Sequence, residues 1–123
     1  MDVKNFLDTY ALIEISKGNP KFMHYSDRGF VINDLIMAEF YSVLLREEGE
    51  EIADYWLKKF EAYSLPVSRT ILIEAVRFRR KHRKKNISFF DAVGYIFSVK
   101  NRLRFVTGDK EFKGFPGVDF VKK

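Results

Sequence analysis

Short apolar segments alternate with longer amphipathic segments along the chain. The apolar segments predict strands, because each is rich in β-branched or aromatic residues and ends near a turn or helix-capping residue. They cover residues 3–7, 29–32, 103–106 and 118–121. Residues 65–67 are expected to form an extended link or an edge strand, since Pro66 has no N–H to donate. Residues 18–20 (GNP) are expected to break the chain direction, and residues 21–28 are too mixed to predict an element.

The segments between the strands have the periodicity and the capping residues of helices. Asn33 or Asp34, Ser68 and Ser88 stand where a side-chain oxygen can accept a hydrogen bond from a first-turn N–H. The predicted helices cover residues 10–14, 34–48, 50–64, 69–85 and 89–99. A turn or short helix is expected at residues 110–113.

This alternation of strands and helices predicts an α/β sandwich with a central, mainly parallel sheet. The sequence has no internal repeat, linker or low-complexity segment, so residues 1–123 are expected to form a single domain. No apolar run approaches the roughly 20 residues that a membrane span needs. The N-terminus also lacks the basic-then-apolar pattern of a signal peptide, and a cytoplasmic protein without membrane contact is therefore expected.

Two of the predicted helices carry apolar positions that can be assigned to the core or to a binding surface. In the helix at 34–48, the expected core positions are Leu35, Ala38, Val43 and Leu45. The helix at 50–64 has a broad aromatic face made of Ile52, Tyr55, Trp56, Phe60 and Tyr63. Core packing is the default interpretation of this face. A protein-binding patch is the alternative, because aromatic residues are enriched at the centres of interfaces.

The charges of the chain are segregated along its length. Residues 1–68 carry 7 basic and 12 acidic side chains, a net charge of −5, whereas residues 69–104 carry 11 basic and 2 acidic, a net charge of +9. The densest basic segment consists of Arg77, Arg79, Arg80, Lys81, Arg83, Lys84 and Lys85. Such a segment can attract a polyanion such as nucleic acid. Cations also stabilise the C-terminus of a helix, so part of the cluster has a purely structural explanation.

Several common types of site are excluded by the sequence. The chain has no cysteine, so disulfides, thiolate metal sites and a cysteine nucleophile are absent. His24 and His82 lack partners at zinc-ligand spacing. Neither a phosphate-binding Walker A loop nor a G-x-S-x-G nucleophile turn is present.

Four acidic residues stand at predicted strand ends and helix starts. Asp8 follows the first strand, Glu39 lies one turn into the helix after the second strand, Asp91 opens a buried helix, and Asp109 follows another strand. Each alone is explained as a cap or a surface acid. Together they would repel one another unless a cation neutralised them. Oxygen ligands favour Mg²⁺ or Mn²⁺, and a metal held in this way can activate water for attack on a phosphodiester.

The sequence resembles the PIN-domain ribonucleases, and especially the VapC-type toxins of toxin–antitoxin pairs, over nearly its whole length. Four segments carry the resemblance: FLDTYALIE with Asp8 and Thr9, MAEFYSVL with Glu39, FFDAVGYIFS with Asp91, and FVTGDKEF with Thr107 and Asp109. All four acids of the family pattern are present, which disfavours an inactive domain.

The resemblance implies a metal-dependent endoribonuclease. Asp8, Glu39, Asp91 and Asp109 would hold one or two Mg²⁺ or Mn²⁺ ions, and RNA would be hydrolysed there. The supporting residues would be Thr9, Thr107 and, as an outer ligand, Glu111. The basic segment at 77–85 would bind the RNA backbone.

The same resemblance implies two protein partners, a second copy in a homodimer and a small antitoxin, with the face around Trp56 available for either contact. Two alternatives stay open. One is a PIN nuclease of RNA maturation without an antitoxin, and the other is a non-catalytic RNA- or protein-binding module whose acids serve only as caps.

Overall fold

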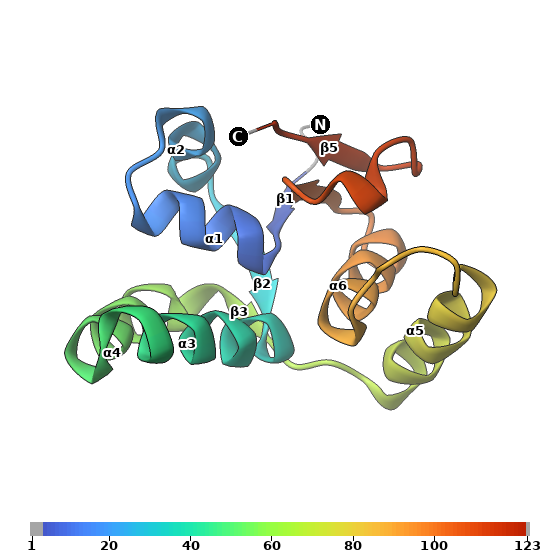
Figure 1. Cartoon of the computed structure of the whole chain (residues 1–123), viewed down its shortest axis with the longest axis horizontal. Helices are drawn as coiled ribbons and strands as arrows, with labels where there is room; N and C mark the ends of the chain where they lie inside the picture. Colours follow the sequence, from blue (N-terminus) through green and yellow to red (C-terminus); the bar gives the residue numbers. More distant parts are fainter. Residues whose placement is uncertain (1–3, 123) are drawn as a thin grey trace.

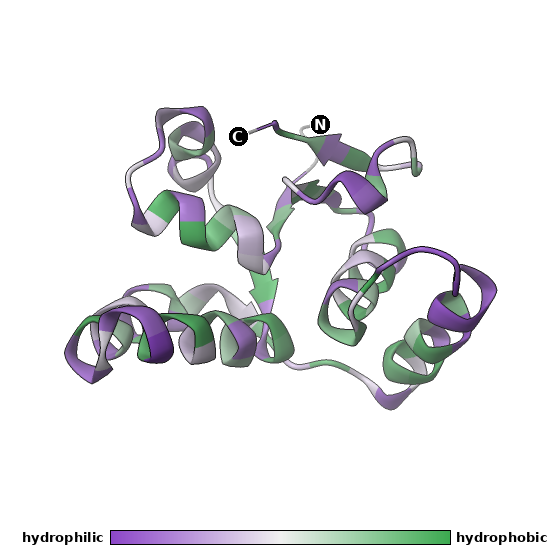
Figure 2. Cartoon of the chain, in the orientation of Figure 1, coloured by the Kyte–Doolittle hydropathy of each residue, from purple (hydrophilic) through white to green (hydrophobic). Residues whose placement is uncertain are grey.

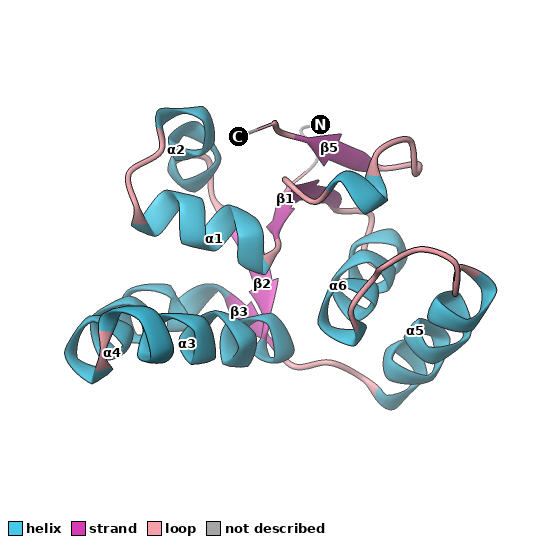
Figure 3. Ribbon diagram, in the orientation of Figure 1, coloured by secondary structure: helices cyan, strands magenta, loops and turns pink. Residues whose placement is uncertain are grey.

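The computed structural model describes residues 4–122, and the predicted start of the first strand at Val3 lies outside them. A five-stranded sheet of order β3-β2-β1-β4-β5 forms the centre of the molecule (Figures 1 and 3). Its strands are β1 (Asn5–Leu7), β2 (Phe30–Asn33), β3 (Ser64–Leu65), β4 (Arg104–Thr107) and β5 (Val118–Phe120). Every pairing between neighbouring strands is parallel. The predicted α/β sandwich with a parallel sheet is therefore confirmed.

Six α-helices surround the sheet, with α1 to α4 on one side and α5 and α6 on the other (Figure 1). They are α1 (Thr9–Ser16), α2 (Pro20–Asp27), α3 (Asp34–Glu48), α4 (Glu50–Phe60), α5 (Arg69–Lys81) and α6 (Phe89–Lys100). Two short 3₁₀ helices, η1 (Glu61–Tyr63) and η2 (Lys110–Phe112), follow α4 and β4. Within residues 4–122, no helix combines the length and apolarity that crossing a membrane requires.

The core is built mainly from aromatic and branched side chains between the sheet and the helices. Phe6 of β1 and Phe105 of β4 are both fully buried, and their rings stack with centroids 5.9 Å apart. Gly94 of α6 faces these rings, because a Cβ there would lie 3.0 Å from the ring of Phe6. The missing side chain lets α6 approach the sheet closely, and this approach fixes the start of α6, where Asp91 lies.

The helix α2 was not predicted, because residues 21–28 are too mixed in character to indicate an element. Asn19 caps the helix, accepting a 3.0 Å hydrogen bond from the N–H of Lys21, and Pro20 occupies the first helical position. Proline fits that position because the first N–H of a helix has no partner within the helix. The Asn-Pro pair was therefore a helix start signal.

Three other predictions of the sequence differ from the structure. The core positions predicted for α3 were only partly right: Leu35 is partly buried and packs against the core, but Ala38 and Leu45 are exposed. The fully buried positions of this helix are Ile36, Met37, Phe40 and Leu44. The helix α5 ends at Lys81 rather than at residue 85, and α4 ends at Phe60 before a 3₁₀ turn. Figure 2 shows that α5 changes from mostly hydrophobic to hydrophilic toward its C-terminal end.

The predicted core packing of the aromatic face on α4 holds for only part of that face. Phe60 is buried, at 3% exposure, and contacts the rings of Phe30 and Phe40. Tyr55 and Ile52 are 57% and 43% exposed. The face is therefore split between a buried end and an open end, and the open end borders a groove described below.

Candidate active site

The four predicted acids come from four different elements and reach one pocket. Asp8 directly follows β1, Glu39 lies in the second turn of α3, Asp91 lies in the first turn of α6, and Asp109 caps η2 after β4. Together with Thr9, Tyr10, Gly108 and Lys110 they line an open pocket of about 530 Å³. The carboxyl ends of parallel strands meet at one edge of a sheet, and this topology gathers the acids there.

The two carboxylate oxygens of Asp8 have different surroundings. Its Oδ1 accepts a 2.8 Å hydrogen bond from the N–H of Ala11 and so caps α1. Its Oδ2 is buried and has no hydrogen-bond partner among residues 4–122. Burial raises the pKa of this carboxyl well above its usual range, and the nearby charge of Asp91 raises it further. Interactions with the Thr107 hydroxyl and the Ala11 N–H oppose this shift only in part.

Asp91, in the first turn of α6, is a second acid whose pKa is raised. The predicted cap of α6 is confirmed, since the N–H of Asp91 donates a 3.1 Å hydrogen bond to Oγ of Ser88. Burial raises the pKa of Asp91 to about 7, and the charges of Glu39 and Asp109 add to the effect. The Ser88 hydroxyl lowers the pKa slightly in return. Near neutral pH this carboxyl is therefore balanced between its charged and neutral forms in the metal-free protein.

Glu39 and Thr9 form a pair between α3 and α1. The Thr9 hydroxyl donates a short hydrogen bond to Oε1 of Glu39 across 30 residues of sequence. Burial raises the pKa of Glu39, and the hydrogen bond from Thr9 lowers it in part. Glu39 lies inside its helix and caps nothing, so the explanation as a helix cap does not apply to this acid.

The turn after β4 positions Asp109. Its N–H donates a 3.0 Å hydrogen bond to Oγ1 of the fully buried Thr107, and its Oδ1 accepts a 3.0 Å hydrogen bond from the N–H of Glu111. The carboxylate of Glu111 turns toward another loop, where Oε1 accepts a 3.1 Å hydrogen bond from the N–H of Asn86. Glu111 is not among the residues that line the acidic pocket. A role as an outer ligand therefore stays a prediction.

Three residues of the pocket were not singled out from the sequence, namely Tyr10, Gly108 and Lys110. The ring of Tyr10 lies against the backbone of Gly108, and a Cβ at position 108 would come within 2.1 Å of that ring. Glycine is therefore required where the strand turns toward Asp109. The only available signal was adjacency, because these residues directly follow Thr9 or flank Asp109.

The chemistry of these donors fits a hard divalent cation. The acids offer only oxygen ligands, which Mg²⁺ and Mn²⁺ prefer. Among the described residues the buried Oδ2 of Asp8 lacks a partner. Burial, and after it the charges of neighbouring carboxylates, raises the pKa values of Asp8 and Asp91, and a bound cation would favour the ionised forms. Within the described part of the chain, no three acidic or histidine side chains already stand close enough together to enclose a metal ion. The acids thus share a pocket without forming a closed cage.

The basic segment at 77–85 lies beside the turn that carries Asp109. Lys85 donates a 3.4 Å hydrogen bond to the backbone carbonyl of Glu111, and its ammonium lies 5.5 Å from the ring centroid of Phe115. Arg79 donates from Nε to the carbonyl of Ile87 at 3.0 Å, so it also has a structural function. Across residues 4–122 the single ion pair joins Lys100 to Glu74, and none of these basic side chains takes part in one.

These features define a class of small α/β proteins in which an acidic pocket lies at the carboxyl edge of a parallel sheet. The family model of the PIN domain matches residues 6–118 of the sequence. The chain therefore belongs to the PIN domain family. No match was found among curated proteins.

Solved structures with the same fold include three from different organisms. A chain of a toxin–antitoxin complex from Klebsiella pneumoniae has a TM-score of 0.75 and 21% identity, over 94% of this chain and 96% of that one. VapC20 of Mycobacterium tuberculosis, described as a Sarcin-Ricin loop cleaving toxin, has a TM-score of 0.77 and 16% identity, over 98% of both chains. PAE2754 of Pyrobaculum aerophilum has a TM-score of 0.70 and 22% identity, over 98% of this chain and 92% of that one. At these identities the similarity shows the shared fold.

Proposed function

We propose that this protein is a metal-dependent endoribonuclease and the toxin of a type II toxin–antitoxin pair. One observation carries the proposal: Asp8, Glu39, Asp91 and Asp109 come from four separate elements and line one pocket. Membership in the PIN domain family supports a nuclease. A fold neighbour described as a Sarcin-Ricin loop cleaving toxin supports RNA as the substrate.

In this proposal the four carboxylates hold Mg²⁺ or Mn²⁺, and the surrounding residues keep them in place. The cation would supply an activated water and stabilise the charge that develops on a phosphodiester. Oδ1 of Asp8 stays engaged with α1, which leaves Oδ2 for the pocket. Thr9 orients Glu39 through its hydroxyl, and Thr107 fixes the turn that presents Asp109.

The purified protein is expected to cleave structured RNA in the presence of Mg²⁺ or Mn²⁺ and to be inactive with a chelator. The reason is that four crowded carboxylates repel both one another and the RNA phosphates until a cation neutralises them. Gel analysis of a labelled RNA measures the cleavage, and restoration of activity by excess Mn²⁺ controls for damage by the chelator. Equal cleavage with and without the chelator would contradict metal dependence.

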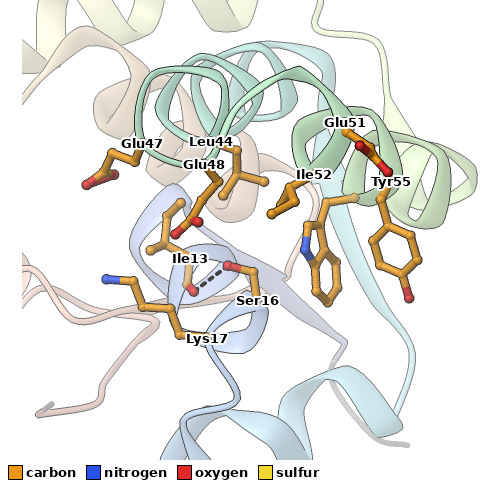
Figure 4. A pocket seen from close by; sticks show the side chains of 10 residues that line it. Ile13, Ser16, Lys17, Leu44, Glu47, Glu48, Glu51, Ile52 and Tyr55 are labelled. Carbon is orange, nitrogen blue, oxygen red and sulfur yellow. Dashed lines mark hydrogen bonds between the residues drawn. The ribbon is translucent and has the colours of Figure 1, made fainter.

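A pocket between α1 and the α3–α4 pair is our proposed site for the antitoxin (Figure 4). This partner groove has a volume of about 780 Å³ and is lined by Ile13, Ser16, Lys17, Leu44, Glu47, Glu48, Glu51, Ile52, Tyr55 and Trp56. Apolar side chains form much of its lining, and three glutamates oppose a single lysine. A basic amphipathic segment matches this combination of apolar and acidic surface.

The fold neighbour from a toxin–antitoxin complex supports such a partner. The toxin proposal further predicts that the gene lies beside a small open reading frame that encodes a DNA-binding pattern. An isolated gene would favour the alternative, a nuclease of RNA maturation.

A homodimer is proposed through the outer faces of α5 and α6. Ile73 and Val76 of α5 are each 53% exposed, and Val99 of α6 is 50% exposed. The 3.1 Å ion pair between Glu74 and Lys100 brings these two faces side by side. An apolar surface shared by two packed helices is the kind of surface that a second copy covers.

The basic segment is proposed to bind the RNA backbone. The triple variant Arg80→Gln/Lys81→Gln/Lys84→Gln removes three exposed cations and keeps Arg79 and Lys85, whose hydrogen bonds are structural. RNA affinity should fall, and the slope of log affinity against log salt should flatten by about 0.7 for each phosphate that the variant no longer neutralises. Fluorescence anisotropy with a labelled RNA in chelator measures both quantities.

The matched control for this variant removes three exposed cations elsewhere, on α3 and α4, as Arg46→Gln/Lys58→Gln/Lys59→Gln. It should bind RNA almost as the unchanged protein does. If the two triple variants behave alike, net charge alone explains the effect and the basic segment is not a specific contact.

A further inference from the structure

A second pocket lies at the opposite edge of the sheet from the acids. It has a volume of about 790 Å³ and is lined by Lys4, Asn5, His24, Tyr25, Arg28, Gly29, Arg104 and Asp119. The strand register explains why these residues meet. Asn5 of β1 pairs with Phe30 of β2 and with Arg104 of β4, so the amino ends of three parallel strands lie together. The N–H of Arg104 also donates to the carbonyl of Lys4 at 2.9 Å.

The charges of this pocket are strongly unbalanced. Lys4, Arg28 and Arg104 are all exposed, and none forms an ion pair within residues 4–122. Asp119 is the one carboxylate among the described residues that line the pocket, and its Oδ2 already accepts a 2.6 Å hydrogen bond from the hydroxyl of Tyr25. Three cations gathered in one concavity repel one another and create a positive potential that favours an anion.

Two aromatic rings give the pocket a second feature. Tyr25 is 8% exposed and anchored to Asp119, and the exposed ring of His24 lies 4.0 Å from the Tyr25 ring, centroid to centroid. His24 therefore packs against a ring that is held in place, and its own ring is exposed in the lining of the pocket. Arginine and lysine are the usual protein ligands of phosphate, and aromatic rings are the usual platforms for nucleobases. The volume lies within the range of pockets that hold small ligands.

We propose that this basic pocket binds a phosphate group, carried either by a free nucleotide or by an RNA strand. Lys4, Arg28 and Arg104 contact the phosphate, and His24 stacks with the attached base. The site goes beyond the proposed function, since it uses none of the acids and needs no metal. It lies at the amino edge of the sheet, so a ligand bound there leaves the acidic pocket open.

The test is the double variant Arg28→Ala/Arg104→Ala, with Lys4→Ala/Arg28→Ala as a second variant in case Arg104 contributes to folding. The probes are inorganic phosphate, uridine 5′-monophosphate and a short single-stranded RNA, all in chelator so that no metal recruits phosphate to the acidic pocket. Calorimetry and the change in melting temperature measure binding. Both variants should weaken the binding of the nucleotide at least about tenfold, because each removes two cations from one phosphate site.

The matched control Arg46→Ala/Lys58→Ala also removes two exposed cations and should bind as the unchanged protein does. If the pocket variants weaken binding of uridine 5′-monophosphate, a free nucleotide is sufficient to occupy the site. If they weaken binding of the RNA alone, the phosphate is supplied by an RNA strand. Equal binding by the pocket variants and the control overturns the proposal. An Asp91→Asn protein should retain this binding in full. The test of the basic pocket therefore does not depend on whether the nuclease proposal is correct.

Discussion

Replacing Asp8 by asparagine should reduce RNA cleavage by about 100-fold or more while leaving the fold intact. Asparagine caps helices as well as aspartate does. Its Oδ1 can therefore keep the 2.8 Å hydrogen bond from the N–H of Ala11. What the substitution removes is the negative charge and the oxygen at Oδ2, the buried atom that has no partner among the described residues. Initial rates of RNA cleavage and the melting temperature measure the two effects.

The variant Asp8→Ala serves as the comparison, because it removes both the charge and the cap. It should lose cleavage to the same extent and should be about 1 kcal/mol less stable than Asp8→Asn, because both variants lack the charge but only asparagine keeps the helix cap. If Asp8→Asn cleaves RNA like the unchanged protein, Asp8 is only a cap and the active-site assignment fails. The pair of variants thus separates the two functions assigned to one side chain.

The sequence was sufficient to predict the acidic pocket because parallel strands impose a simple geometry. Each strand end delivers the residue that follows it to the same edge, so Asp8 and Asp109 could be expected at one edge of the sheet. The pattern of the sequence did not fix the strand order, and the structure shows that β1 and β4 are neighbours. Asp91 could be placed because Ser88 marks the start of its helix. The position of Glu39 could be predicted because α3 follows β2 directly, with Asn33 as its cap.

Other features depend on contacts between distant parts of the chain, which local patterns do not contain. The buried face of α3 is set by packing against α4, α1 and α6, and several residues on other faces of that helix are also apolar. The loop after α5 is held by hydrogen bonds from Arg79 and Lys85 to the carbonyls of Ile87 and Glu111, and these partners are distant from the end of the helix in the sequence or belong to the loop itself. The requirement for glycine at position 108 comes from the ring of Tyr10, which belongs to a helix near the start of the chain.

The metal-free protein should be less stable near neutral pH than in mild acid, and Asp91→Asn should remove much of this dependence. Burial, followed by the charges of Glu39 and Asp109, raises the pKa of Asp91 from its usual 3.8 to about 7. At a pH well below 3.8 this carboxyl is protonated in both the folded and the unfolded chain. As pH rises toward 7, the unfolded chain loses the proton first, so the folded state loses stability until its own carboxyl has ionised.

The raised pKa values of Asp8 and Glu39 act in the same direction. Near pH 8, in chelator, Asp91→Asn should therefore melt at a higher temperature than the unchanged protein although it no longer cleaves RNA. Thermal unfolding between about pH 5 and pH 8 measures the effect. Glu51→Gln, which removes an exposed acid from α4, should follow the pH profile of the unchanged protein.

Addition of Mn²⁺ near neutral pH should raise the melting temperature of the unchanged protein more than that of Asp91→Asn, because a ligand that binds only the folded state stabilises it more as its affinity rises. A lower melting temperature for Asp91→Asn in chelator, or equal gains from Mn²⁺ in both proteins, would contradict the interpretation of Asp91 as a destabilising metal ligand. Confirmation would mean that the carboxylates reduce the stability of the metal-free fold because they are arranged for a cation rather than for one another.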